Sequence, residues 1–105
     1  MLKMLTIVYI FPGRISKKLT KIFKALSNPN RLKLYHEISK KNEAFFETGC
    51  FVYKISEKFS IGAPTISHHL KELENADLIT TQRHGKQLTA RINKDTFEKI
   101  KDIIN

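Results

Sequence analysis

The sequence predicts a mainly α-helical domain with one small β-hairpin, in the order α-α-α-α-β-β-α. Three observations predict this class. Apolar residues recur at helical spacing through most of the chain, whereas residues 78–92 show the alternation of two short strands. The length of 105 residues allows one compact core rather than two.

The composition excludes some classes of protein and favours others. Hydrophobic residues make up 41% of the chain, with only 4 Gly and 3 Pro, which is a globular composition and not that of a disordered tail or a linker. The formal net charge of +9 favours a polyanionic partner. Nucleic acid is the first such partner to consider, and a membrane surface the second.

The N-terminal apolar run is too short to cross a membrane. It extends over residues 4–11, whereas a spanning helix needs about 20 apolar residues. Pro12, Gly13 and Arg14 follow it in place of a small-residue cleavage site, so we do not expect a secretory signal. The single cysteine, Cys50, fits a reducing, cytoplasmic compartment. We expect residues 1–13 to form an apolar extension and residues 14–105 the functional domain.

Two helices are predicted in the first half of the chain. Ser16 can cap the first, which is basic and amphipathic. Asn28 followed by Pro29 predicts the start of a second helix that ends near Lys41. Residues 42–49 lack a clear period and are expected to form a loop.

A helix-turn-helix is predicted next. Val52, Ile55 and Phe59 stand at i, i+3 and i+7 and indicate a short helix ending before Ser60. Helix 63–75 follows after a brief connection, with Pro64 in its first turn. Two helices with so short a connection are typical of this motif.

A hairpin and a last helix complete the chain. Residues 78–82 and 87–92 are expected to be strands joined by a tip at residues 83–86, so that residues 78–92 form a wing. Either Asn93 or Asp95 can cap the final helix.

Helix 63–75 presents a polar face that suits the reading of DNA bases. Its apolar residues share one side at 100° per residue, which leaves hydrogen-bonding side chains of moderate length on the other sides. Such side chains near a helix N-terminus can reach base edges in the major groove. The candidates are Thr65, Ser67, His68 and Lys71. An ordinary solvated helix face is the alternative.

The wing tip is basic. Arg83, His84 and Lys86 surround Gly85, where they could touch a phosphate or enter a minor groove. A solvated basic turn is the alternative. Residues 51–75 carry no net charge, so the positive charge lies on either side of the predicted reading helix.

Two stretches resemble the ArsR family of bacterial winged-helix repressors: residues 24–38, KALSNPNRLKLYHEI, and residues 55–93, ISEKFSIGAPTISHHLKELENADLITTQRHGKQLTARIN. The resemblance implies a winged helix-turn-helix fold and a homodimer joined by the first and last helices. It also implies binding to an imperfect palindrome near the promoter of its own gene. Arg31 resembles a recurrent family arginine, which touches a phosphate or braces the fold.

A homodimer also has a physical rationale. One reading helix covers few base pairs, whereas a two-fold dimer places two such helices about 34–36 Å apart on one side of the duplex. The first and last helices carry apolar side chains that a short chain cannot easily cover alone. The expected dimerisation residues are Leu19, Ile22, Phe23, Phe97, Ile100 and Ile104.

The metal-sensing positions of that family are not filled. The two cysteine positions before the motif hold Phe51 and Tyr53, which do not bind soft metals. The last helix has Asp95, Glu98 and Asp102 but no histidine, so its carboxylates are expected to be a solvated face. We therefore expect no metal and no cofactor, and the sequence names no inducer.

Cys50 is the one candidate thiol sensor. Lys54 could lower the pKa of Cys50 and favour the thiolate if the helix geometry brings the two side chains together. A small buried hydrophobic residue is the preferred interpretation, because thiol switches of this type generally need a resolving cysteine.

The predicted function is sequence-specific binding of double-stranded DNA by a homodimeric repressor. A non-specific nucleic-acid-binding protein would use the same charge without reading bases. A protein-interaction module would use the same fold against an acidic partner. An enzyme is not expected, because no nucleophile with a base, carboxylate pair or phosphate-binding glycine loop has a useful spacing.

Overall fold

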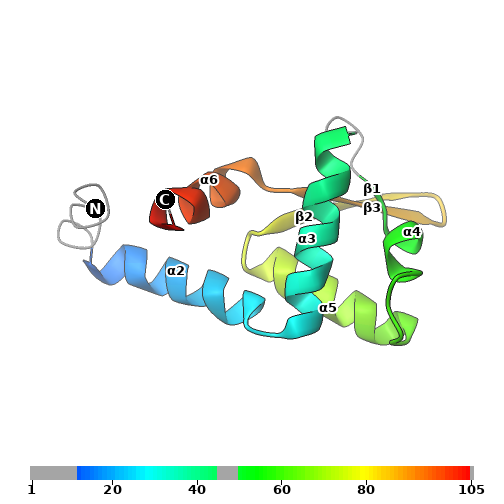
Figure 1. Cartoon of the computed structure of the whole chain (residues 1–105), viewed down its shortest axis with the longest axis horizontal. Helices are drawn as coiled ribbons and strands as arrows, with labels where there is room; N and C mark the ends of the chain where they lie inside the picture. Colours follow the sequence, from blue (N-terminus) through cyan, green and yellow to red (C-terminus); the bar gives the residue numbers. More distant parts are fainter. Residues whose placement is uncertain (1–11, 45–49, 105) are drawn as a thin grey trace.

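The computed structural model describes residues 12–44 and 50–104 of the chain. This part forms helices around a small antiparallel sheet, in the predicted order with one strand added (Figure 1). The helices are α2 (Pro12–Leu26), α3 (Pro29–Ala44), α4 (Val52–Ser56), α5 (Ala63–Asn75) and α6 (Lys94–Ile104). The strands are β1 (Cys50–Phe51), β2 (Ile79–His84) and β3 (Gln87–Ile92), in the sheet order β1-β3-β2. The prediction of a mainly α-helical winged helix-turn-helix is confirmed.

Helix α2 begins earlier than predicted. It starts at Pro12, so Ser16 lies inside the helix and is not its cap. Proline is tolerated in a first helical turn, because the N–H that it lacks would have no partner there. Of the expected N-terminal extension, residues 1–11 lie outside the described part.

The turn between α2 and α3 follows the predicted capping. The side-chain Oδ1 of Asn28 accepts hydrogen bonds from the backbone N–H groups of Asn30, at 2.9 Å, and Arg31, at 3.1 Å. Pro29 is the first residue of α3. Asn93 caps α6 in the same way, since its Oδ1 accepts from the N–H of Asp95 at 3.1 Å.

The segment before the helix-turn-helix differs from the prediction. Helix α3 continues to Ala44, so residues 42–44 are helical, and the remainder of the expected loop lies outside the described residues. Strand β1 was not predicted, because its two residues are defined by pairing with Thr89 and Ala90 rather than by a pattern of their own. Helix α4 ends at Ser56 instead of Phe59.

Helix α3 is the centre of the domain. It packs against α2, α4, α5 and β3. Residues at helical spacing supply its buried side, with Leu34 and Ile38 fully inaccessible to solvent. Ile55 of α4, Leu73 of α5 and Ile79 of β2 are buried in the same core. The helices and the hairpin are therefore held by one apolar cluster.

Polar contacts attach the helix-turn-helix turn to α3. The Nζ atom of Lys58 lies 2.8 Å from Oε2 of Glu37, whose side chain is only 10% exposed. Lys33 donates from Nζ to the carbonyl of Lys58 at 3.0 Å, and the same Nζ atom lies 4.6 Å from the ring centroid of Phe59. Phe59 packs against the core although α4 has already ended. These contacts hold the chain between α4 and α5.

We predict that Glu37→Gln lowers the free energy of unfolding by about 1 kcal/mol at neutral pH. The hydrogen bond from Lys58 holds the pKa of Glu37 below its ordinary value. A carboxyl group with a depressed folded-state pKa stabilises the fold above its unfolded pKa, and this stabilisation is lost as the pH falls through the folded pKa.

Urea unfolding at pH 7 and at stepwise lower pH measures this contribution. The difference between wild type and Glu37→Gln should shrink as the solution becomes acidic. Glu98→Gln is the control, because Glu98 is 63% exposed and 3.7 Å from Lys101. A Glu37→Gln deficit that stayed constant down to pH 2 would contradict the assignment.

Candidate nucleic-acid interface

Helix α5 exposes the predicted reading face. Its buried residues are Ile66, His69, Leu70 and Leu73, which pack toward the core. Thr65, Ser67, His68 and Lys71 are all exposed. Its N-cap residue is Gly62, which supplies no side-chain hydrogen bond, and the first turn contains no acid. Its N-terminal end therefore combines free backbone donors with exposed polar side chains.

The wing lies along one flank of this helix. The Glu74 Oε1 atom accepts two hydrogen bonds from Thr81, one from the backbone N–H at 3.1 Å and one from Oγ1 at 2.8 Å. At 100° per residue, Ser67 projects from the same flank as Glu74. Ser67 is therefore the reading candidate on the flank that carries the contact with β2.

The wing tip is a two-residue turn. His84 pairs with Gln87, and Gly85 has a φ of 63°, which glycine adopts without steric cost. Arg83, His84 and Lys86 are exposed around it. The hairpin projects from the end of the molecule opposite α2 and α6 (Figure 1).

Arg31 has a bracing bond. Its side-chain Nε donates to the carbonyl of Ala25 at 2.6 Å, which joins the first turn of α3 to the last turn of α2. The residue is half-buried, and its charge also acts on His69 of α5. Of the two roles that the resemblance implied, the structure gives Arg31 the bracing contact; a phosphate contact stays a prediction.

His69 differs from its exposed neighbour His68. It is only 7% exposed, and its Nδ1 has no hydrogen-bond partner among the described residues. Burial lowers the pKa of His69, with a further contribution from the Arg31 charge. His69 is therefore a neutral part of the core, whereas His68 is accessible to DNA.

The expected dimerisation residues divide into two groups. Ile22 is fully buried and Ile100 is 9% exposed within one chain, so both pack in the core of the single chain, and a role for them in a dimer interface stays a prediction. Leu19 and Phe97 are partly buried against that core. Phe23, at 43%, and Ile104, at 72%, are exposed.

Helices α2 and α6 meet at one end of the molecule (Figure 1). Lys18 of α2 is close enough to Lys99 of α6 to lower its pKa, chiefly through a side-chain hydrogen bond. Burial of Lys99 acts in the same direction, while Asp95 and Asp77 oppose it. Phe23 of α2 and Ile104 of α6 are the exposed apolar side chains that these two neighbouring helices carry.

The structure adds little support for the candidate sensor residues. The backbone of Cys50 pairs with Ala90 in the sheet, and its side chain lies outside the described part. Tyr53 is 49% exposed on α4. Glu98 of α6 pairs with Lys101 at 3.7 Å. Within the described residues, no group of three or more His, Cys, Asp or Glu could hold a metal ion.

The contact between Glu74 and Thr81 was not predicted from the sequence. A signal was present, because a carboxylate in the last turn of a helix is unfavourable beside the negative end of the helix dipole. Glu72 and Glu74 both stand near the end of α5, where no basic residue is found. An acid in that position indicates a tertiary partner.

Comparison with known proteins identifies the family. Residues 28–81 match the family described as "Bacterial regulatory protein, arsR family". The chain is 32% identical over 92 residues to an arsenical resistance operon repressor of Staphylococcus xylosus, covering 85% of this chain and 82% of that protein. The chain belongs to the arsR family of bacterial regulatory proteins.

Two further proteins are similar to this chain, one in sequence and one in fold. The transcriptional repressor SdpR of Bacillus subtilis (strain 168) is 30% identical over 77 residues, covering 73% of this chain and 78% of SdpR. A solution structure from Mycobacterium bovis, described as a homodimeric winged helix-turn-helix DNA-binding domain, has a TM-score of 0.68. It is 19% identical and covers 89% of this chain and 80% of that one, which shows a common fold.

This arsR-family chain is thus a DNA-binding regulator with a winged helix-turn-helix. The family is described as one of bacterial regulatory proteins. Among the helices that the structure describes, none is long and apolar enough to cross a membrane.

We predict that Glu74→Ala loosens the wing, whereas Glu74→Gln retains it. Alanine removes both hydrogen bonds to Thr81, while glutamine keeps an acceptor oxygen. Amide hydrogen exchange at Thr81 should accelerate about fivefold in the alanine variant, for a loss of about 1 kcal/mol. Glu57→Ala, at an exposed acid in the turn after α4, is the control. Equal exchange in wild type and Glu74→Ala would show that the contact does not hold the strand.

Proposed function

We propose that this protein is a homodimeric transcriptional repressor that binds a palindromic operator. The observation that carries the proposal is the exposed polar face of α5, with the basic hairpin tip beyond β2 on one flank. An arsR-family assignment and two relatives described as repressors support it. Helix 63–75 would lie in the major groove, and the wing, residues 78–92, against the backbone or the adjacent minor groove.

The proposal assigns different roles to the two elements. Thr65, Ser67, His68 and Lys71 would contact base edges, because they are exposed on the helix that enters the groove. Arg83, His84 and Lys86 would contact phosphates, which contribute affinity but little direct sequence information. Arg31 would contribute mainly by holding α2 and α3 together.

The dimer would form through α2 and α6. Phe23 and Ile104 are exposed apolar side chains on these helices, and Leu19 and Phe97 are partly exposed. The homodimeric description of the Mycobacterium bovis domain supports this assembly. Two copies would present two α5 helices to successive major grooves.

The inducing signal would differ from that of a soft-metal sensor using two cysteines before the motif. Two relatives are described as arsenical resistance repressors, but this chain has Phe51 and Tyr53 at those positions. Neither aromatic side chain supplies a thiolate for a soft metal.

Binding to a duplex from the upstream region of its own gene tests the proposal. Affinity should fall steeply as salt rises, because each neutralised phosphate contributes about 0.9 to the slope of log affinity against log salt. Equal affinity for random DNA at physiological salt would instead favour a non-specific nucleic-acid-binding protein. Absence of DNA binding with an intact dimer would favour a protein-interaction module.

We predict that His68→Ala and Lys86→Ala have different effects on DNA binding. His68→Ala should change the preferred bases in a selection from random duplexes, because its ring is exposed on the reading face. Lys86→Ala should weaken binding to all duplexes alike and reduce the salt slope by about 0.9 per subunit. The opposite pattern would show that the two roles are reversed.

We predict that Phe23→Glu produces a monomer. A carboxylate at this exposed position on α2 would be desolvated in the proposed interface, whereas it would remain hydrated in the monomer. Leu32→Glu is the matched control, since Leu32 is also exposed, at 51%, but lies on α3. Light scattering should give the mass of a single chain, 12.2 kDa, for Phe23→Glu only. A dimer in both variants would place the interface elsewhere.

A further inference from the structure

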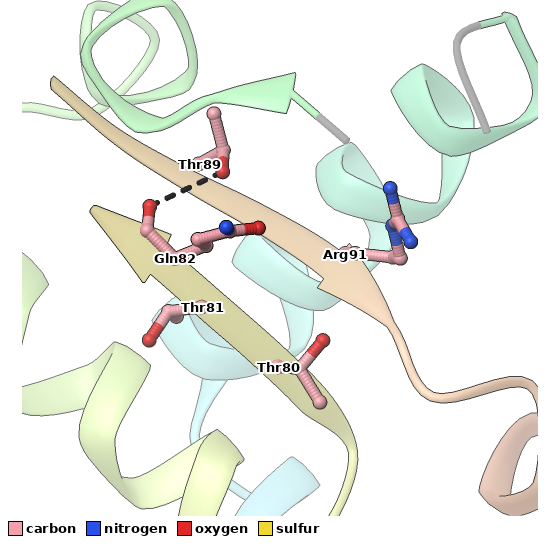
Figure 2. A pocket seen from close by; sticks show the side chains of 5 residues that line it. All are labelled: Thr80, Thr81, Gln82, Thr89 and Arg91. Atoms are coloured by element: carbon pink, nitrogen blue, oxygen red, sulfur yellow. Dashed lines mark hydrogen bonds between the residues drawn. The ribbon is translucent and has the colours of Figure 1, made fainter. Parts of the chain in front are cut away.

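The hairpin has a polar hollow near its base, away from the tip. Figure 2 shows this hollow, of about 240 Å³, on the face of β2 and β3 that is turned away from α3. Its lining residues are Thr80, Thr81, Gln82, Thr89 and Arg91. No acidic side chain lines it.

Strand pairing brings the donor groups of the hollow together. Thr80 lies directly opposite Arg91, and Gln82 directly opposite Thr89. Directly opposed side chains have Cβ atoms about 4.5–5.5 Å apart. Thr80, Gln82 and Arg91 are exposed, so a hydroxyl, an amide and a guanidinium are available on one small surface.

Neighbouring contacts hold the two strands of this surface in place. The Thr89 hydroxyl donates to the Gln82 carbonyl at 3.2 Å, which links the two strands across the hollow. Thr81 is attached to α5 through Glu74. On the other face of the strands, Ile79, Ala90 and Ile92 are buried in the core.

The hollow lies next to α5, because Thr81, one of its lining residues, is hydrogen-bonded to Glu74 of that helix. Helix α3 packs against both α5 and β3. Figure 2 shows α5 beside β2, with α3 behind the strands. DNA lying against α5 would therefore pass close to the hollow.

We infer that this face of the wing base is a second phosphate-binding site for the DNA backbone, with Arg91 as its charged group. The guanidinium would donate two parallel hydrogen bonds to the phosphate oxygens, and Thr80 and Gln82 would add neutral donors. This inference rests on the proposed DNA-binding function and extends the contact from the wing tip to the wing base. The absence of acid in the lining suits a monoanionic phosphodiester.

Arg91→Gln tests the inference in the full-length protein. Fluorescence anisotropy over a series of salt concentrations should show a salt slope reduced by about 0.9 per subunit. The loss should be equal on upstream and random duplexes, because phosphates carry no direct base information. Arg91→Lys should keep the wild-type slope, since it retains the charge.

Lys40→Gln is the matched control, because Lys40 is an exposed cation on α3, the helix that packs against β3. It should leave the slope unchanged, and the circular dichroism melting curves of both variants should resemble that of wild type. A wild-type protein that binds no DNA would overturn both this inference and the proposed function. Wild-type binding with an unchanged slope for Arg91→Gln would overturn this inference alone.

Titration with inorganic phosphate distinguishes the binding of a DNA phosphate from the binding of a small free anion. Amide shifts at Thr80, Gln82 and Thr89 should move when duplex DNA is added, and Arg91→Gln should suppress these movements. Movement with millimolar inorganic phosphate, combined with an unchanged DNA salt slope in Arg91→Gln, would assign the hollow to a free anion and overturn the inference.

Discussion

The packing of α5 and the hairpin against a single helix, α3, is the constraint on which the interface depends. Leu34 and Ile38 of α3 are fully buried in the core that also receives Leu73 of α5 and Ala90 of β3. Because both elements use one side for this burial, their opposite sides are exposed together. This exposure is what the proposed contacts of α5 and the wing with DNA require.

Polar contacts fix the relative positions of the elements more closely than apolar packing does. An apolar stripe allows a helix to rotate or slide by a fraction of a turn, whereas a hydrogen bond between particular atoms does not. The two bonds from Thr81 to Glu74 set the wing relative to α5. The contacts of Lys58 with Glu37 and Lys33 set the turn before α5 relative to α3. Arg31 does the same for α2 through the carbonyl of Ala25.

Much of the fold was predictable because its signals are local. Asn28 with Pro29, the apolar spacing of residues 66, 70 and 73, and the alternation around Gly85 each act over a few neighbouring residues. The features that the sequence did not predict depend on contacts between distant parts of the chain. Strand β1 exists through its pairing with β3, and α4 ends early while Phe59 still reaches the core. Ile22 had the right spacing for a helix face, but spacing does not tell a core from an interface.

The sequence alone determined the order of the elements, the helix-turn-helix, the basic tip and the family, since periodicity, capping residues and motif spacing are properties of neighbouring residues. Tertiary structure decided which apolar residues remain exposed, how Arg31 is engaged and which polar groups share a surface. Thr80, Gln82 and Arg91 come from two strands, and only the register of β2 on β3 brings them together. Exposure and juxtaposition depend on packing between elements, which no single segment specifies.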